Sequence, residues 1–273
     1  MRAKNIRKRT MENEENVRPE PAQETLIPEK LAAFLAAIKV AHSVEVKVTV
    51  PETSHRSALA ALGIDPLEVQ LRQVYFFDTS DLALNARGLI VRARRVQAKG
   101  DDSVVKLRRA NLDGLPNRLR KSPNLVIEVD AIPGGYVCSA SVKGSLGTTD
   151  VKDVTAGRRP INKLYSKEQQ AFYAAFAPHG LGLDGLSVLG PINVFKLKFN
   201  PVGLKRKLVV EQWNYPDGSR ILELSTKATP DQAVQAASDI RSLLSKIGVD
   251  LSGEQRTKTK TALEFFSREL RST

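Results

Sequence analysis

Apolar and polar residues alternate through much of the chain, and this pattern predicts β-strands. In SVEVKVTV (43–50) and LVIEVDA (125–131) apolar residues occupy every second position, and in LIVRARRV (89–96) they do so from Leu89 to Ala93. Alternate side chains of a strand share a face, so each segment predicts a strand with one apolar and one polar face. The expected strands cover 43–50, 69–77, 89–96, 103–109, 125–131, 193–200, 205–214 and 219–227. Eight strands are enough to close a barrel.

Other segments do not alternate in this way. The charged residues 1–27 predict a disordered tail, and 28–42 place apolar residues at helical spacing, which indicates an amphipathic helix. The folded domain is expected over 43–270. Within it, 132–190 is first glycine-rich and then helical, which indicates an insert between strands. Thr229 and Pro230 are typical of a helix start, and 261–270 predicts a last helix. Asp78 and Thr79 are more often a turn and helix cap than catalytic groups.

Charged pairs occupy the polar face of successive predicted strands. They are Glu45 with Lys47, Arg92 with Arg94, Lys106 with Arg108, Glu128 with Asp130, and Lys196 with Lys198. One such pair on one strand is usually the solvated face of a half-buried sheet. Five pairs favour another interpretation, in which the apolar residues face covering helices and the charges line the inside of a barrel.

A charged tunnel of this kind requires a charged ligand, because unpaired charges are costly to desolvate. A phosphate chain would neutralise the basic residues, and arginine can bind phosphate oxygens through two parallel hydrogen bonds. Glu45, Glu128 and Asp130 would repel phosphate, so we expect them to hold Mg²⁺ or Mn²⁺, hard cations that take oxygen ligands.

Composition limits the choice of partner and compartment. The chain has 42 Lys and Arg against 30 Asp and Glu, a net charge of +12, which favours polyanionic partners. Its single cysteine, Cys138, excludes an internal disulfide framework and fits a reducing compartment. No apolar run approaches the ~20 residues of a membrane span. We therefore expect a cytoplasmic protein without membrane contact; the sequence does not predict an oligomeric state.

Several of these segments resemble the CYTH domains, or triphosphate tunnel metalloenzymes, a family that includes class IV adenylyl cyclases, thiamine triphosphatases and inorganic triphosphatases. The resemblance spans most of 43–265 and is carried by VEVKV, YFFDTSDLALNARGLIVRAR, VVKLRR, VIEVD and KTK (258–260). It implies an eight-stranded antiparallel β-barrel tunnel covered by helices, an α+β fold. It also implies that basic residues bind triphosphate, that glutamates hold a divalent metal, and that metal-activated water attacks the terminal phosphoryl group.

The sequence departs from the family pattern in its acidic residues. Ser43 replaces the first glutamate of the family's Glu-x-Glu-x-Lys, and Glu223 is followed by Ser225 and Lys227 where further acidic residues are usual. Trp213 also falls near Glu211 in a strand of uncertain register. Fewer carboxylates predict weaker metal binding, since affinity for hard cations rises with ligand charge.

Three functions remain open at this point. The first is a metal-dependent triphosphatase for an inorganic or organic triphosphate, with Glu45 and Lys47 as catalytic residues. The second is a diverged tunnel that binds polyphosphate or a nucleoside triphosphate without hydrolysis. The third, a nucleic-acid binder, is disfavoured because only 5% of residues are aromatic and no stacking platform is evident. The expected metal ligands are Glu45, Glu128, Asp130, Glu211 and Glu223; the expected phosphate ligands are Lys47, Arg92, Arg94, Lys106, Arg108, Lys196, Lys198 and Lys258.

Overall fold

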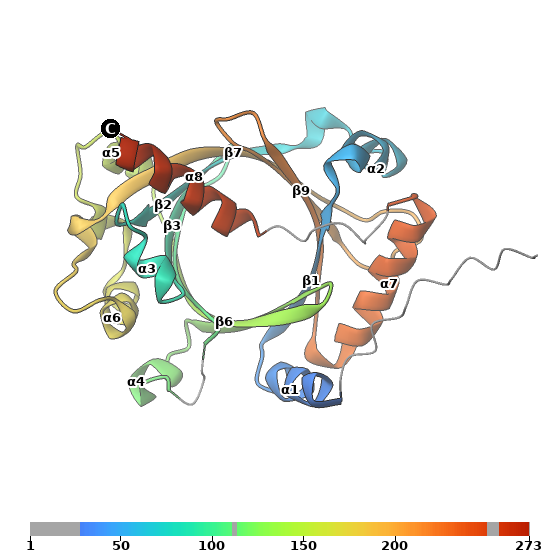
Figure 1. The fold of residues 1–273 in the computed structure, drawn as a ribbon, viewed down its shortest axis with the longest axis horizontal. Helices are drawn as coiled ribbons and strands as arrows, with labels where there is room; N and C mark the ends of the chain where they lie inside the picture. Colours follow the sequence, from blue (N-terminus) through green and yellow to red (C-terminus); the bar gives the residue numbers. More distant parts are fainter. Residues whose placement is uncertain (1–27, 111–113, 250–256, 273) are drawn as a thin grey trace, which may run out of the picture.

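The computed structural model describes residues 28–110, 114–249 and 257–272, and its centre is a closed β-barrel (Figure 1). The strands are β1 (Ser43–Val50), β2 (Gln70–Asp78), β3 (Leu89–Val96), β4 (Asp102–Arg108), β5 (Leu125–Ile132), β6 (Gly135–Ser145), β7 (Ser187–Phe199), β8 (Leu208–Asn214) and β9 (Arg220–Ala228). Their order around the barrel is β1, β5, β6, β4, β3, β2, β7, β8, β9, and β9 pairs with β1. The alternating segments of the sequence therefore do form a barrel.

The expectation of eight antiparallel strands was wrong. In the described part of the chain the barrel has nine strands, and β1 and β5 run parallel. A closed ring with an odd number of strands cannot be antiparallel throughout, so at least one neighbouring pair must be parallel. All other neighbouring pairs are antiparallel.

The strand that the alternation did not predict is β6, in the segment interpreted as a glycine-rich and helical insert. It follows β5 through a tight turn at Pro133 and Gly134, where Gly134 has a φ of 79°. Proline followed by a glycine with positive φ is typical of a type II turn. Small residues such as Ser139, Ala140 and Ser141 replace the bulky apolar residues that usually mark a strand.

Helices cover the outside of the barrel. They are α1 (Pro28–Lys39), α2 (His55–Ala61), α3 (Ala83–Ala86), α4 (Asn117–Arg120), α5 (Asp150–Thr155), α6 (Lys167–Phe176), α7 (Ala233–Lys246) and α8 (Lys258–Ser272). On one side, the outward valines of β1 are buried in an apolar core with α2 and α7. On the other side, α5 and α6 pack on β3, β4 and β6 (Figure 1). Apolar residues thus face outward under helices, as the alternation predicted.

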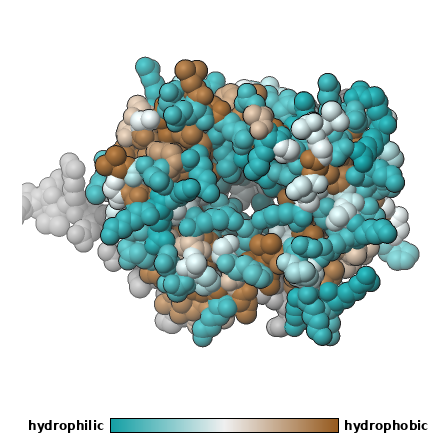
Figure 2. All heavy atoms as spheres, turned by 180° about the vertical axis from the view of Figure 1, so that it is seen from behind, coloured by the Kyte–Doolittle hydropathy of each residue, from teal (hydrophilic) through white to brown (hydrophobic). Residues whose placement is uncertain are grey.

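Helix α8 differs from the other helices because it lies across one end of the barrel (Figure 1). Its Ala262, Leu263 and Phe266 share an apolar core with inward residues of the strands, among them Val74 and Ile192. Opposite α8, hydrophilic residues surround a hollow near the middle of the face (Figure 2). One end of the barrel is therefore closed by apolar packing, and charged residues inside the barrel meet the first residues of α8. No helix in the described residues is long and apolar enough to cross a bilayer.

Candidate functional site

The inner face of the barrel carries the charged residues. On β1 the valines at even positions are buried outside, whereas Glu45, Lys47 and Thr49 alternate with them on the inside. The same alternation and the strand registers place further charged side chains inside: Arg72, Arg92, Arg94, Asp102, Lys106, Arg108, Glu128, Asp130, Lys143, Lys196, Glu211, Glu223 and Lys227. Lysines and arginines outnumber carboxylates in this set, so the inner wall has an excess of positive charge.

The first cluster joins β1, β5 and β4. The Lys47 ammonium lies 3.3 Å from Glu45 and 3.0 Å from Asp130, and Lys106 lies 3.6 Å from the other oxygen of Asp130. Burial raises the pKa of Asp130, but Lys47 and Lys106 outweigh this and lower it to about 2. Burial lowers the pKa of Lys47, whereas Glu45 and Asp130 raise it, and the net shift is upward. Here cations and carboxylates compensate one another.

The second cluster joins β7, β8, β9 and the first residue of α8. Glu211 and Glu223 lie directly opposite each other on neighbouring strands. The Lys258 ammonium lies 2.5 Å from Glu211 and 2.7 Å from Glu223, and Lys196 lies 2.7 Å from Glu211. Trp213 faces inward, and its Nε1 donates to Glu211 at 3.2 Å, which resolves the register around this residue. Burial raises the pKa of Glu211, but Lys258 and Lys196 hold it well below its usual range.

Arginines dominate a third region, on β2, β3 and β4. Arg94 makes two hydrogen bonds of 2.8 Å to Asp102, and Arg108 donates to Thr259 of α8 at 2.9 Å. The buried Nε of Arg92 has no hydrogen-bond partner among the described residues. Burial and then the neighbouring Arg94 lower the pKa of Arg92 to about 10, so its guanidinium is still charged near pH 7. Unlike the two lysine–glutamate clusters, this region leaves positive charge uncompensated.

At the rim of the tunnel lie residues with more contact to solvent. Glu128 pairs with Lys143 at 3.4 Å and with Lys227 at 2.5 Å, and both lysines are half exposed. Lys198, expected to bind phosphate, is exposed at the end of β7 and stands apart from the clusters. The structure thus brings together all the expected site residues except Lys198.

Sequence reasoning also missed several charged residues of the inner face. Arg72 shares its strand with polar neighbours and was not part of a charged pair, although Arg94 and Glu211 are close enough to influence its pKa. Lys143 belongs to β6, the strand that was not predicted. The pairing of β2 with β3 places Arg72 on the inner face, and the pairing of β6 with β4 places Lys143 there.

Asp78, by contrast, has a structural role. Its carboxylate accepts hydrogen bonds from the backbone N–H groups of Thr79, Leu84 and Asn85, at 2.8 to 3.0 Å. These bonds satisfy N–H groups at the start of α3, as a helix cap does. The interpretation of Asp78 as a cap is confirmed.

The carboxylates of the tunnel do not fit a divalent metal in this arrangement. No group of three or more histidine, cysteine, aspartate or glutamate side chains among the described residues could hold one. Five carboxylates face inward, and each is paired with at least one lysine: Glu45, Glu128, Asp130, Glu211 and Glu223. Magnesium needs near-octahedral oxygen coordination, and at least one oxygen of each of these carboxylates already contacts an ammonium group.

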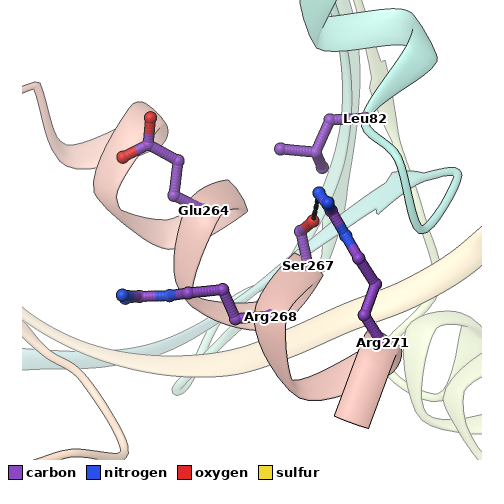
Figure 3. A pocket seen from close by; sticks show the side chains of 5 residues that line it. All are labelled: Leu82, Glu264, Ser267, Arg268 and Arg271. Atoms are coloured by element: carbon purple, nitrogen blue, oxygen red, sulfur yellow. Dashed lines mark hydrogen bonds between the residues drawn. The ribbon is translucent and has the colours of Figure 1, made fainter.

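A pocket outside the barrel contains none of these tunnel residues. It lies beside α8 and is lined by Leu82, Glu264, Ser267, Arg268 and Arg271 (Figure 3). Ser267 donates to the carbonyl of Ser80 at 2.7 Å, and Arg271 donates to the same carbonyl at 3.1 Å and to Ser267 at 2.6 Å. These bonds fasten α8 to the turn after β2, so we interpret this region as an anchor of α8.

Solved structures of other proteins share this architecture. The chain matches HpAC1 from Hippeastrum, described as having a dominant triphosphatase activity, with a TM-score of 0.58 and 17% identity over 81% of this chain and 95% of that one. It matches a candidate adenylate cyclase from Bacillus halodurans with a TM-score of 0.54 and 14% identity over 81% and 97%. Neither protein-family models nor curated proteins give a match. The chain has the CYTH, or triphosphate tunnel, fold.

Proposed function

We propose that the tunnel binds the phosphate chain of a linear triphosphate, either tripolyphosphate or a small molecule that carries a triphosphate. The observation that carries this proposal is the buried guanidinium of Arg92, whose Nε has no hydrogen-bond partner among the described residues and which lies beside Arg94 and Arg108. A buried cation without a partner is costly, and an anion with several oxygens removes this cost. Arginine also matches the geometry of phosphate oxygens better than lysine does.

Chain length is the property that tests this proposal most directly. The cations extend from Lys47 on β1 across Lys106 and Arg108 to Arg92 and Arg94 on β3. A longer phosphate chain contacts more of them, so we expect affinity to rise from phosphate to pyrophosphate to tripolyphosphate. Calorimetric titration of the full chain with each compound measures this order. Equal and weak binding of all three would contradict the proposal.

Two substitutions test whether Arg92 itself binds the phosphate chain. Arg92→Met removes the buried guanidinium, and loss of a charge-assisted hydrogen bond of about 2 kcal/mol predicts roughly 30-fold weaker tripolyphosphate binding. Lys260→Met removes the same unit of charge from an exposed site on α8, where Lys260 pairs only loosely with Glu264 at 3.7 Å. We expect the control to bind as the unchanged chain does. Equal losses in both variants would indicate a general effect of net charge.

The second candidate is hydrolysis of the bound triphosphate. It is favoured by Glu45, whose carboxylate lies inside the tunnel, 3.0 Å from the Ser225 hydroxyl and 3.3 Å from Lys47. A carboxylate in this place can orient a water molecule beside a phosphate chain. The triphosphatase activity described for HpAC1, which has the same fold, makes this reaction the natural one to test.

Phosphate release separates the two candidates. Purified protein is incubated with tripolyphosphate in Mg²⁺, in Mn²⁺ and in chelator, and the same set is repeated with Glu45→Gln. Turnover that the substitution abolishes would support hydrolysis, and loss of turnover in chelator would support the metal dependence that the family resemblance implies. Binding without turnover would leave a carrier or sensor of triphosphate. Binding only to nucleic acid, weakening steeply with salt, would contradict both.

A further inference from the structure

The Lys258 ammonium lies between two carboxylates that face each other across neighbouring strands. Glu211 of β8 and Glu223 of β9 are directly paired in register, and Lys258 is within 2.7 Å of both. Two carboxylates so close together repel each other unless a cation lies between them. A divalent metal is one solution to this problem, and an ammonium group is another.

Both oxygens of Glu211 have further partners. One oxygen of Glu211 pairs with Lys196, and the other accepts from Trp213 as well as from Lys258. The Lys258 ammonium also lies over the Trp213 ring, 5.1 Å from its centroid, where a cation–π interaction adds to the ion pairs. A metal bound here would have to displace several of these contacts.

The backbone of Lys258 is fixed as firmly as its side chain. Its carbonyl accepts a 3.0 Å hydrogen bond from the hydroxyl of Tyr215, and the next residue, Thr259, accepts one from Arg108. Farther along α8, Ala262, Leu263 and Phe266 are buried in the apolar core that closes the barrel end. The ammonium is thus delivered to this position by a rigid, anchored helix.

We propose that Lys258 is a built-in cation that takes the place of a divalent metal between Glu211 and Glu223. The tunnel then binds its phosphate chain without a metal, because both carboxylates are already neutralised. This inference rests on the proposed function for its ligand and adds a statement about the cation requirement of the same site.

Binding of Mn²⁺ without any phosphate tests the inference. Electron paramagnetic resonance reports free Mn²⁺ during titration of the unchanged chain, of Lys258→Met and of Lys196→Met. Lys258→Met frees the space between the two carboxylates, so we expect it to bind Mn²⁺ at least about tenfold more tightly than the unchanged chain. Lys196→Met is the matched comparison: it removes one ammonium from Glu211 but leaves Lys258 between the two carboxylates, so we expect a clearly smaller gain in Mn²⁺ affinity than in Lys258→Met.

This titration would overturn the inference if Lys258→Met bound Mn²⁺ no more tightly than the unchanged chain does. Circular dichroism of each variant first establishes that it is folded. If Lys258→Met does not fold, Lys258→Gln is titrated in its place, since its uncharged amide also removes the ammonium.

A measurement on the unchanged chain decides the same point independently. Tripolyphosphate affinity is compared in chelator and in Mg²⁺, and we expect affinity in chelator to be at least as high. Binding that requires Mg²⁺ would overturn the inference while leaving the proposed function intact. If tripolyphosphate does not bind under either condition, the proposed function fails, and the Mn²⁺ titration still decides the role of Lys258.

Discussion

The two sides of the tunnel wall differ in how their charged side chains are paired. On the side of β1, β5, β8 and β9, carboxylates and lysines are joined in ion pairs, as in the contacts of Lys47 with Glu45 and Asp130. On the side of β2, β3 and β4, arginines exceed their carboxylate partners, and the Nε of Arg92 has none among the described residues. The first side is already neutral and contributes stability, whereas the second side needs an anion. Removing a cation should therefore have opposite consequences on the two sides.

The largest effect is expected on the paired side, at Lys47. Lys47→Met leaves Glu45 and Asp130 inside the tunnel without their shared ammonium. Removing one partner of a buried ion pair leaves an uncompensated charge, and we expect the free energy of unfolding to fall by about 3 kcal/mol. Urea denaturation of both proteins measures the difference. An unchanged midpoint of urea denaturation would show that the ion pairs on this side of the barrel do not stabilise the fold.

The stabilisation provided by the same cluster should depend on pH through Asp130. Its pKa in the folded state is about 2, below the usual value of 3.8, because Lys47 and Lys106 outweigh its burial. The stabilisation is therefore fully present above about pH 4 and is lost as pH falls toward 2. The shift corresponds to about 2 kcal/mol of unfolding free energy. In Asp130→Asn this part of the acid dependence is expected to vanish; equal loss of stability in both proteins between pH 4 and 2 would assign it elsewhere.

A smaller effect is expected at the rim. Glu128 has two lysine partners, Lys143 and Lys227, and both are half exposed. Solvent screens such pairs and the second lysine remains, so Lys227→Met should lower the free energy of unfolding by about 0.5 kcal/mol or less. A loss as large as that at Lys47 would mean that the rim and the tunnel interior do not differ.

The smallest stability effect is expected on the arginine side. Arg92→Met removes a buried charge that lacks a partner at Nε among the described residues, so we expect the free energy of unfolding to stay the same or rise. The same substitution is expected to weaken tripolyphosphate binding, which separates stability from ligand binding. Thermal unfolding with and without tripolyphosphate measures both in one experiment. If Arg92→Met without ligand were destabilised as much as Lys47→Met, the two sides would not differ in their contribution to stability.

Strong alternation made most of the fold predictable. Strand β1 was predicted with the bounds that the structure has, and so was β3, because apolar residues occupy all or most of their outer faces. Strand β6 was not predicted because its serines and alanine are not hydrophobic enough to mark a strand. Without β6 the predicted barrel had eight strands, and the parallel pairing of β1 with β5 was not expected. Alternation reports burial of large side chains, so a strand of small residues escapes it.

The candidate site was predictable only in part. The pairs Arg92 with Arg94 and Lys106 with Arg108 followed from spacing along one strand, which depends only on local geometry. Arg72 had no such partner in its own strand, and Lys198 had one but lies at the exposed end of β7. Depth within a tunnel depends on strand register and shear, which spacing within one strand does not contain.

The amino-acid sequence alone determined that charges share the inner faces of strands and that apolar residues face covering helices. Both follow from the two-residue period of a strand, a local property. Only the tertiary structure decided which charges meet. Glu211, Glu223 and Lys258 come together because β8 and β9 are in register and α8 closes the barrel end, bringing in a residue 47 positions beyond Glu211. Contacts at that separation are set by the packing of whole elements.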